Sequence, residues 1–538
     1  MNKQWISRKW LALALTGWLL AGCNSESGGN GGSTITPPEE LFLTRLSVKL
    51  DGVVRNGLML SAYKGEVLVE ETPEQGISGV ADYQFETTYA ENDNYKVVIA
   101  HQPEEQLCRV INGSGIINPE NTADIRIECR SWEDSEQDVS AATTSNFHAA
   151  LNDQGDAVVV WKTAGANSIY SSKFYSEGQV NESVAQFGDV KGGYFKTAID
   201  SDGNAVTVWR HGGDNGLYSQ SRIKDSTNWS VPIRIDDDVK TKDQPISLSM
   251  NASGEAMVVW SPETGSSALG VKHYEGNNGW TGDLKHFGAN KGIANSPKVV
   301  VNDSGEAVAI WGELNAALLI RSSFYTPASS PGEGTWNDIH DISMHTHSIG
   351  SLPLITLNNN GQAVAIWNVD NNLYASVLSP LNNEWSEGAL LTESGPLNHR
   401  IVLDNQGRAM ALWLQKDKDG SADIVVSHYN FGSDEAVWED AQVLVDLASP
   451  LTVNGFDIAM NALGEAVLLW EQAGGGGNNK MYSSLYAPDQ KAWSTTPTQL
   501  GTADGPYDDL IQVVINQNGQ ALALWADLSR NIKAKFFK

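Results

Sequence analysis

The sequence predicts an all-β protein, with a small β-sandwich followed by an eight-bladed β-propeller. The propeller is predicted by one motif that occurs eight times between Asn152 and Trp525: Asn or Asp, two residues, Gly, a polar residue, Ala, three mostly apolar residues and Trp. Successive copies lie 46 to 57 residues apart. That spacing is typical of repeats that bury their apolar faces against their neighbours. An antiparallel sandwich is predicted by alternating apolar runs ahead of the repeats, such as Leu43 to Leu50 and Tyr95 to Ala100.

Each motif predicts a tight hairpin. Asn or Asp at the first position of a four-residue turn and Gly at the fourth favour a type I turn, because the short polar side chain bonds nearby backbone and Gly tolerates positive φ. The apolar run after the turn, such as Ala157 to Trp161, has no polar face, so we expect a strand buried between two sheets. The motif glycines are Gly155, Gly203, Gly254, Gly305, Gly361, Gly407, Gly464 and Gly519, and the motif tryptophans are Trp161, Trp209, Trp260, Trp311, Trp367, Trp413, Trp470 and Trp525.

Two further strands are expected in each repeat. The third alternates polar and apolar residues, as in Leu217 to Ile223 and Met481 to Tyr486. The fourth is marked by a second tryptophan: Trp229, Trp280, Trp336, Trp385, Trp438 or Trp493. The first repeat lacks this tryptophan. Residues that recur in every repeat are usually packing residues, so we expect these tryptophans in the core. The alternative is a ring of exposed sugar-binding platforms.

The ends of the repeat region predict how the ring closes. The last repeat stops after a third strand, Ile532 to Phe537, whereas Trp132 precedes the first turn. We therefore expect residues 131–140 to supply the missing strand of the last blade, which leaves no open sheet edge. The predicted propeller domain spans residues 131–538.

The N-terminus predicts export. Lys3, Arg8 and Lys9 precede an apolar stretch, Trp10 to Leu20, that is too short to span a membrane. Leu20-Ala21-Gly22-Cys23 resembles the lipobox of bacterial lipoproteins, which implies removal of residues 1–22 and lipid attachment to Cys23. Asn24 follows in place of the Asp that retains such proteins at the inner membrane in the enteric pattern, so the resemblance favours the outer membrane. Residues 23–40 are rich in Gly, Ser and Asn and predict a flexible tether.

Residues 41–130 contain the two remaining cysteines, Cys108 and Cys129, 21 positions apart in a β-rich segment. In an oxidising compartment we expect a disulfide between them, because no Cys-x-x-Cys pair is present and a metal site would need further ligands. The stretch from Tyr95 to Cys129, with Gln106-Leu107-Cys108 and Asn112-Gly-Ser-Gly, resembles the Ig-like domain next to the tether of many secreted bacterial lipoproteins. The propeller repeats likewise resemble those of uncharacterised surface lipoproteins. Neither resemblance implies a catalytic residue.

Charge and metal-ligand residues exclude some functions. The formal net charge of −29 disfavours nucleic acid and anionic lipid headgroups and favours divalent cations. His345 and His347 would point to the same side of an extended segment. Asp417, Asp419 and Asp423 around Gly420 form a weak calcium-loop pattern. A third ligand is missing in the first case and the bidentate Glu in the second, so we expect no cofactor, with Ca²⁺ as the alternative.

We expect a binding or scaffolding protein of the cell envelope, anchored in the membrane through lipid on Cys23 and recognising a protein or glycan. The expected binding face carries the loops between second and third strands and between blades, because binding residues concentrate on variable loops held by a rigid scaffold. These loops include Lys416 to Asp423, Gly474 to Lys480, Asp236 to Gln244 and Met344 to Leu352. Two alternatives remain: a glycoside hydrolase or lyase with acidic residues in the central depression, and a periplasm-facing assembly factor.

Overall fold

The computed structural model describes residues 42–538 except for 121–122, 141–142, 166–167, 177–178, 184–187, 225, 227, 238–240, 242–244, 263–268, 288–292, 315–317, 329–333, 346–350, 381–382, 419, 434–435, 475–478 and 504–509. Strands dominate the described chain, and the one helical element is a 3-10 helix, η1 (Gly276–Asn278). The all-β prediction is confirmed. Across these residues no helix has the length and apolarity needed to cross a membrane.

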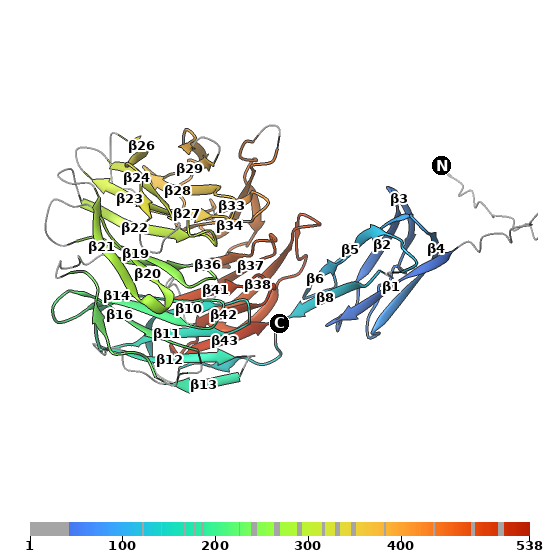
Figure 1. Cartoon of the computed structure of the whole chain (residues 1–538), viewed down its shortest axis with the longest axis horizontal. Coiled ribbons are helices and arrows are strands. Elements are labelled where there is room, and N and C mark those ends of the chain that lie inside the picture. The colour runs from blue at the N-terminus through green and yellow to red at the C-terminus, as the bar shows by residue number, and fades with distance from the viewer. Residues whose placement is uncertain are drawn as a thin grey trace, which may run out of the picture.

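Residues 43–131 form two sheets packed face to face (Figure 1). Leu46, Val48, Phe85 and Ile127 are buried between them. One sheet has the order β4 (Asp82–Ala90), β1 (Leu43–Asp51), β8 (Ile125–Ser131), β6 (Gln106–Ile111), and the other has the order β3 (Val67–Glu71), β2 (Met59–Lys64), β5 (Asn94–His101), β7 (Ser114–Ile116). We expected purely antiparallel pairing from the alternation, and this was wrong for one pair: β1 and β8 run parallel. Alternation fixes which face of a strand is buried but not the direction of the neighbouring strand.

The expected disulfide between Cys108 and Cys129 is confirmed. The two residues are direct cross-strand partners on β6 and β8 of one sheet, so the bond links the last two strands of that sheet rather than the two sheets. Both cysteines are buried in the core of the sandwich.

The rest of the chain consists of antiparallel groups in which first, second and third strands follow one another in sequence. The first strands are β10 (Thr144–Leu151), β14 (Gly188–Ile199), β18 (Ser247–Met250), β22 (Ile293–Val301), β27 (Ser351–Leu357), β32 (His399–Leu403), β36 (Thr452–Met460) and β41 (Ile511–Ile515). The second strands are β11 (Ala157–Thr163), β15 (Ala205–His211), β19 (Glu255–Trp260), β23 (Ala307–Leu314), β28 (Ala363–Val369), β33 (Arg408–Lys416), β37 (Ala466–Ala473) and β42 (Ala521–Ala526). The third strands are β12 (Ser168–Ser176), β16 (Leu217–Arg222), β20 (Leu269–Glu275), β24 (Leu318–Thr326), β29 (Asn372–Ser379), β34 (Ala422–Asn430), β38 (Asn479–Ala487) and β43 (Ile532–Phe537).

Short outer strands complete the groups. They are β9 (Gln137–Asp138), β13 (Gln179–Ser183), β17 (Ile233–Arg234), β21 (Trp280–Phe287), β25 (Thr335–Trp336), β26 (His340–His345), β30 (Glu384–Trp385), β31 (Ala389–Thr392), β35 (Gln442–Val445), β39 (Ala492–Trp493) and β40 (Thr498–Ala503). Two extra pairs, Ser168 with Asp189 and Ile169 with Gly188, join the first two groups into one eight-stranded sheet.

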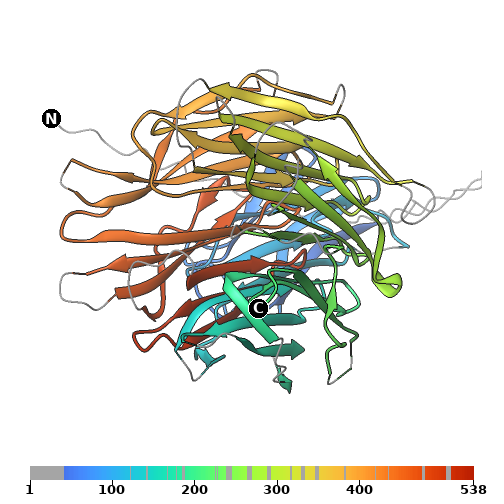
Figure 2. The ribbon, with the colours of Figure 1, turned by 90° about the vertical axis from the view of Figure 1, so that its left-hand side faces the viewer.

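The groups are arranged around a centre, and the first part of the repeat region lies beside the last (Figure 2). Each first strand contacts the next one in sequence, and β41 contacts β10. The outermost strand of the last group comes from the start of the region: β9 pairs antiparallel with β43, and Trp132 bridges Phe537. The two ends of the repeat region are therefore hydrogen-bonded to each other.

The motif tryptophans lie in the core between groups. Seven of them are at most 1 % exposed, and Trp161 is 5 % exposed. Several stack on a tyrosine of the third strand, such as Trp209 on Tyr218 and Trp470 on Tyr482. The motif alanines, such as Ala157, are fully buried beside them. This packing leaves the motif tryptophans no surface for a ligand.

The sandwich contacts the edge of the ring where the chain passes from β8 to β9. Leu107 of the sandwich packs into a cluster with Trp132 and Leu485 of the repeat region. Arg109 Nη1 donates to the carbonyl of Gln517 at 3.4 Å. The sandwich therefore lies on the side of the ring where the motif turns project.

Candidate binding site at the ring of turns

Each motif turn is held by its own first side chain. Asn461 Oδ1 accepts the backbone N–H groups of Leu463 at 3.1 Å and Glu465 at 3.0 Å, and Asn152 Oδ1 does the same two and four residues on. The fourth residue of every turn is a Gly with φ between 75° and 91°. The predicted turn geometry is confirmed.

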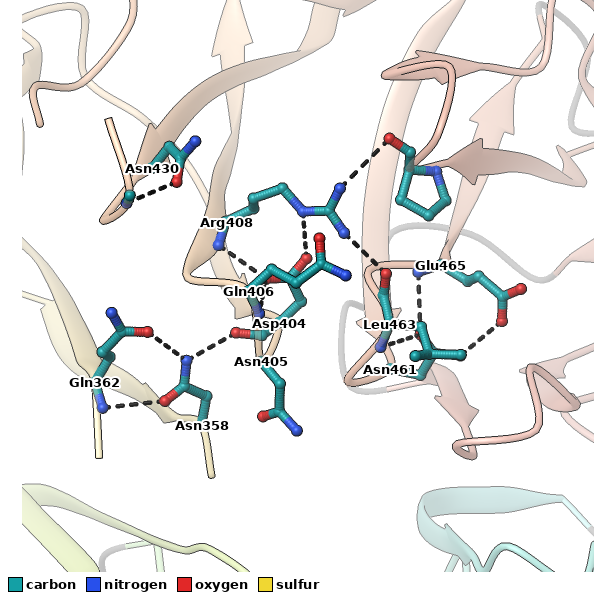
Figure 3. Close-up of polar contacts among 12 residues, drawn as sticks. Asn358, Gln362, Asp404, Asn405, Gln406, Arg408, Asn430, Asn461, Leu463 and Glu465 are labelled. Carbon is teal, nitrogen blue, oxygen red and sulfur yellow. Dashed lines mark hydrogen bonds and ion pairs between the residues drawn. The ribbon is translucent and has the colours of Figure 1, made fainter. Parts of the chain in front are cut away.

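The first and fifth residues of a turn are chemically complementary (Figure 3). Where the first residue is Asn and the fifth is Glu or Gln, Asn Nδ2 donates to the fifth side chain, as from Asn461 to Glu465 Oε2 at 2.7 Å and from Asn358 to Gln362 Oε1 at 2.8 Å. Where the first residue is Asp, the fifth is a donor: Arg408 Nε donates to Asp404 Oδ2 at 2.5 Å. The other pairs joined in this way are Asp200 and Asn204, Asn251 and Glu255, Asn302 and Glu306, and Asn516 and Gln520. In the first turn Asp156 instead forms an ion pair with Lys224 Nζ at 3.2 Å.

Hydrogen bonds also join each turn to the next. In six turns the first Asn donates through Nδ2 to the first carbonyl of the following turn: Asn152 to Asp200, Asn251 to Asn302, Asn302 to Asn358, Asn358 to Asp404, Asn461 to Asn516, and Asn516 to Asn152. The two Asp turns lack this donor, and the backbone N–H groups of Ser201 and Asn405 donate instead to the carbonyls of Ala252 and Ala462, each at 3.0 Å. Together these bonds form a closed circuit through all the motif turns.

A hollow of about 310 Å³ lies at the centre of this circuit. Its rim consists of the second residue of every turn: Asp153, Ser201, Ala252, Asp303, Asn359, Asn405, Ala462 and Gln517. Its collar consists of the residue before every turn: Leu151, Ile199, Met250, Val301, Leu357, Leu403, Met460 and Ile515. Every collar residue is aliphatic or Met, so the hollow has a largely polar rim above an apolar wall.

Three rim side chains are each held to a neighbouring turn through one oxygen. Asn405 Oδ1 accepts the N–H of Asn359 at 3.0 Å, Gln517 Oε1 accepts that of Ala462 at 2.8 Å, and Asp153 Oδ1 accepts that of Gln517 at 2.9 Å. No hydrogen bond joins another described residue to Asn405 Nδ2, Gln517 Nε2 or Asp153 Oδ2. The rim therefore presents two amide donors and a carboxylate acceptor in fixed positions.

A second, charged hollow of about 660 Å³ lies between the sandwich and the turns and shares Asp153 with the first. Arg109 and Arg130 both bind Glu128 Oε2 there, at 2.9 Å and 3.4 Å. Burial, and then the nearby Arg109 charge, lower the pKa of Arg130 from its ordinary value. The wall of this hollow mixes arginines with Asp51, Glu128 and Asp156, so its charges offset one another.

On the opposite face, where we expected the ligand, the described residues include a polar cluster around Asp214. His211 Nδ1 lies 2.8 Å from Asp214 Oδ1, and Tyr218 donates to Asp214 Oδ2 at 2.9 Å. Burial raises the pKa of Asp214, but hydrogen bonds from the Gly216 N–H, Tyr218 and His211 outweigh burial and lower the pKa to about 2. Parts of all four variable loops lie outside the described residues. Both hollows described above are lined by residues of the motif turns and therefore lie on the face opposite to the expected one.

The remaining predicted site residues are placed as follows. Cys23, His347 and Asp419 lie outside the described residues, and His345 ends β26. Asp417 belongs to a hairpin turn, in which its carbonyl accepts the Gly420 N–H at 3.1 Å. Within the described ranges no three His, Cys, Asp or Glu residues are grouped so as to hold a metal ion.

The rim and the complementary pairs were not recognised from the sequence, although the pairs leave a signal in it. The fifth residue of the motif is Asn or Arg in the two turns that begin with Asp, and Asp, Glu or Gln in the six that begin with Asn. Such a correlated exchange of donors and acceptors indicates a side-chain pair.

No family model matches this sequence, and no curated protein does. Among solved structures, the polysaccharide lyase Uly1 is similar over 75 % of this chain and 98 % of its own, at 10 % identity and a TM-score of 0.39. A PL25 ulvan lyase bound to -[GlcA(1-4)Rha3S]- is similar over 62 % and 90 %, at 9 % identity and 0.39. An Aleuria aurantia lectin mutant in complex with Fucalpha1-6GlcNAc is similar over 57 % and 98 %, at 12 % identity and 0.33. These TM-scores lie below 0.5, so no function is transferred from those proteins.

Proposed function

We propose that this chain is a lipid-anchored binding protein of the outer membrane that holds a glycan at the centre of its ring of turns. In this proposal Cys23 carries the lipid, residues 24–40 form the tether, residues 41–130 form an Ig-like domain and residues 131–538 form an eight-bladed propeller. The lipobox resemblance supports the anchor. The eight groups of strands, the contact between β41 and β10 and the pairing of β9 with β43 support the propeller.

The glycan assignment depends on the chemistry of the central hollow. Sugar hydroxyls both donate and accept, so they pair with amides and carboxylates such as Asn405, Gln517 and Asp153. The C–H faces of a sugar ring fit the aliphatic collar below. A hollow of about 310 Å³ suits a small ligand or the end of a chain. The inter-turn bonds fix these groups before the ligand arrives, which reduces the entropic cost of binding.

Glycan-array binding by the full-length protein in detergent micelles tests this function. Asn405→Asp and Gln517→Glu keep an oxygen that can accept the inter-turn bond, replace the amide donor with a second oxygen and add one negative charge. We expect each to weaken glycan binding by about tenfold, which corresponds to about 1.4 kcal/mol. The matched control is Gln442→Glu on the exposed outer strand β35, which we expect to bind as wild type. Equal binding by all three variants, or no glycan bound by the wild type, would contradict the proposal.

A second candidate function is glycoside hydrolysis or lyase chemistry in the same hollow. Two rim carboxylates, Asp153 and Asp303, favour it. Incubation of any bound glycan with the protein, followed by analysis of chain length, separates the two functions. Shortened or unsaturated products that disappear in Asp153→Asn and Asp303→Asn would establish the enzyme. Intact glycan after prolonged incubation supports binding alone.

The side of the membrane is tested on intact cells. We propose display at the cell surface, because a tether of about 17 residues ahead of a folded domain lets the turn face reach ligands beyond the membrane. Protease added to intact cells should then remove the protein, whereas a protein facing the periplasm is cleaved only after the outer membrane is opened.

A further inference from the structure

Close to the turns, the first strands carry charge at one register only. Within the last five residues before each turn, every Lys, Arg, Asp or Glu is the fourth residue before the first turn residue. The residues at this register, which we call the axial belt, are His148, Lys196, Ser247, Lys298, Leu354, Arg400, Asp457 and Gln512.

Hydrogen bonds place the axial belt along the inner edges of the first strands. One edge of each first strand pairs with the second strand, and the other faces the centre of the ring. Belt side chains accept N–H groups on that free edge of a neighbouring first strand: His148 Nδ1 from Thr197 at 3.3 Å, Ser247 Oγ from Val299 at 3.2 Å, Asp457 Oδ2 from Val513 at 3.0 Å, and Gln512 Oε1 from Ala149 at 2.8 Å. The belt therefore lies around the axis, below the rim and the collar.

The belt is cationic in an acidic protein. It contains Lys196, Lys298 and Arg400 but one acid, Asp457, which already binds Arg400 Nε at 2.8 Å. The formal net charge of the whole chain is −29. Most of the surface thus repels anions, whereas the belt attracts them.

Lys196 and Lys298 both act electrostatically on His148. Burial lowers its pKa well below the ordinary value, and the charges of Lys196 and Lys298 lower it further. The ring is therefore neutral at pH 7. Because Nδ1 accepts the Thr197 N–H, the ring proton is on Nε2, which is a donor. Two ammonium groups and an imidazole N–H are suited to an anionic oxygen.

Compact side chains occupy one register between the collar and the belt. The residue two before each turn is Ala, Ser, Thr or Val in every repeat: Ala150, Ala198, Ser249, Val300, Thr356, Val402, Ala459 and Val514. The side chain of Ser249 accepts the Val301 N–H at 3.0 Å, which places this register on the same inner edges. Rim and belt are five residues apart, about 16 Å at a strand rise of roughly 3.3 Å per residue.

We propose that the axial belt binds the carboxylate or sulfate group of an acidic saccharide whose other end is held at the rim. This inference rests on the proposed glycan function and names the class of glycan. Lys196, Lys298 and the Nε2–H of His148 bind the anionic oxygens.

Calorimetric titration of the full-length protein in detergent micelles tests the proposal with three probes: sodium sulfate, a uronate-containing oligosaccharide and a neutral oligosaccharide of equal length. We expect the acidic oligosaccharide to bind at least tenfold more tightly than the neutral one. The double variant Lys196→Gln, Lys298→Gln should lose that preference and also its binding of sulfate. Lys196→Arg, Lys298→Arg should keep both within about threefold, which guards against a folding defect.

The matched control is the double variant Lys418→Gln, Lys480→Gln, which removes the same charge from exposed positions and should bind as wild type. Equal binding of acidic and neutral oligosaccharides, sensitive to Gln517→Glu, would overturn this inference and leave the proposed function intact. Binding of sulfate without the acidic oligosaccharide would overturn the saccharide assignment. Failure of every oligosaccharide would overturn the proposed function itself.

Discussion

Replacing Asn461 by Asp tests the complementarity of the turns, because it places two carboxylates where the structure has an amide and a carboxylate. Asn461 is 2 % exposed, and its Nδ2 donates to Glu465 Oε2 at 2.7 Å. Asn461→Asp removes a donor to a charged acceptor, a contact typically worth about 1.5 to 3 kcal/mol. It also adds repulsion between like charges. At pH 7 this repulsion costs no more than protonating a carboxyl with an ordinary pKa near 4.3, about 3.7 kcal/mol.

We therefore expect Asn461→Asp to lower the free energy of unfolding by about 3 to 4 kcal/mol at pH 7. The carboxyl pair would have a raised pKa in the folded state, so the repulsive part of the cost is complete above that pKa and disappears as the pH falls toward 4. Asn358→Asp is the matched control, because Gln362 can rotate its amide to donate to the new carboxylate. We expect it to cost about 1 to 2 kcal/mol with little dependence on pH.

Urea unfolding followed by tryptophan fluorescence measures both variants. Apart from Trp5, Trp10 and Trp18 in the predicted signal segment, every Trp lies at residue 132 or beyond, so the fluorescence of the chain without that segment reports on the ring of repeats. The exchange variant Asn461→Asp, Glu465→Gln restores a donor and an acceptor with unchanged net charge and should recover most of the lost stability. Equal costs for Asn461→Asp and Asn358→Asp at pH 7, or a cost for Asn461→Asp that is undiminished at pH 4.5, would refute the reasoning.

Three further outcomes are expected. Gly519→Ala combines a φ of +77° with a Cβ that would overlap Glu465 Oε2, so it should lower the free energy of unfolding in urea by at least about 2 kcal/mol. Gly420→Ala, with a φ of +90° and open space around the new Cβ, should lower it by about 1 kcal/mol. Equal costs would argue against the contact with Glu465. Cys108→Ser should destabilise the sandwich by about 3 kcal/mol, seen as faster amide exchange in residues 42–131 with an unchanged fluorescence midpoint. Asp214 has a pKa of about 2 against an ordinary 3.8, so it contributes stability that is present above pH 4 and lost as the pH falls through 2. Its side chain is 40 % exposed, so we expect a contribution of about 1 kcal/mol. This pH-dependent contribution should be absent from Asp214→Asn in the same pH series.

Much of the fold could be predicted because its cues are local. The Asn-x-x-Gly turns depend on bonds between residues two and four apart, and the buried second strands show as continuous apolar runs such as Ala466 to Trp470. Cys108 and Cys129 were predicted as a disulfide from compartment and number, but their position as cross-strand partners in one sheet was not. The parallel pairing of β1 and β8 was missed because strand direction is set by partners far away in the sequence.

The candidate site could not be predicted in the same way. Asp153, Asn405 and Gln517 occupy the variable second position of the motif, which holds five residue types in eight repeats, so sequence reasoning assigned no role to them. They become a rim only because the turns close into a circuit and face one centre. The axial belt is similar: Lys196 and Lys298 are 102 positions apart, and both act on His148 because their strands surround one axis.

The sequence by itself thus determined the repeat unit, its turns, its buried tryptophans and the disulfide, because each depends on periodicity or on contacts within one unit. The tertiary structure decided which face carries the hollow and which side chains meet there. Those features arise from contacts between repeats, and no local pattern encodes which residues of separate repeats converge on the axis.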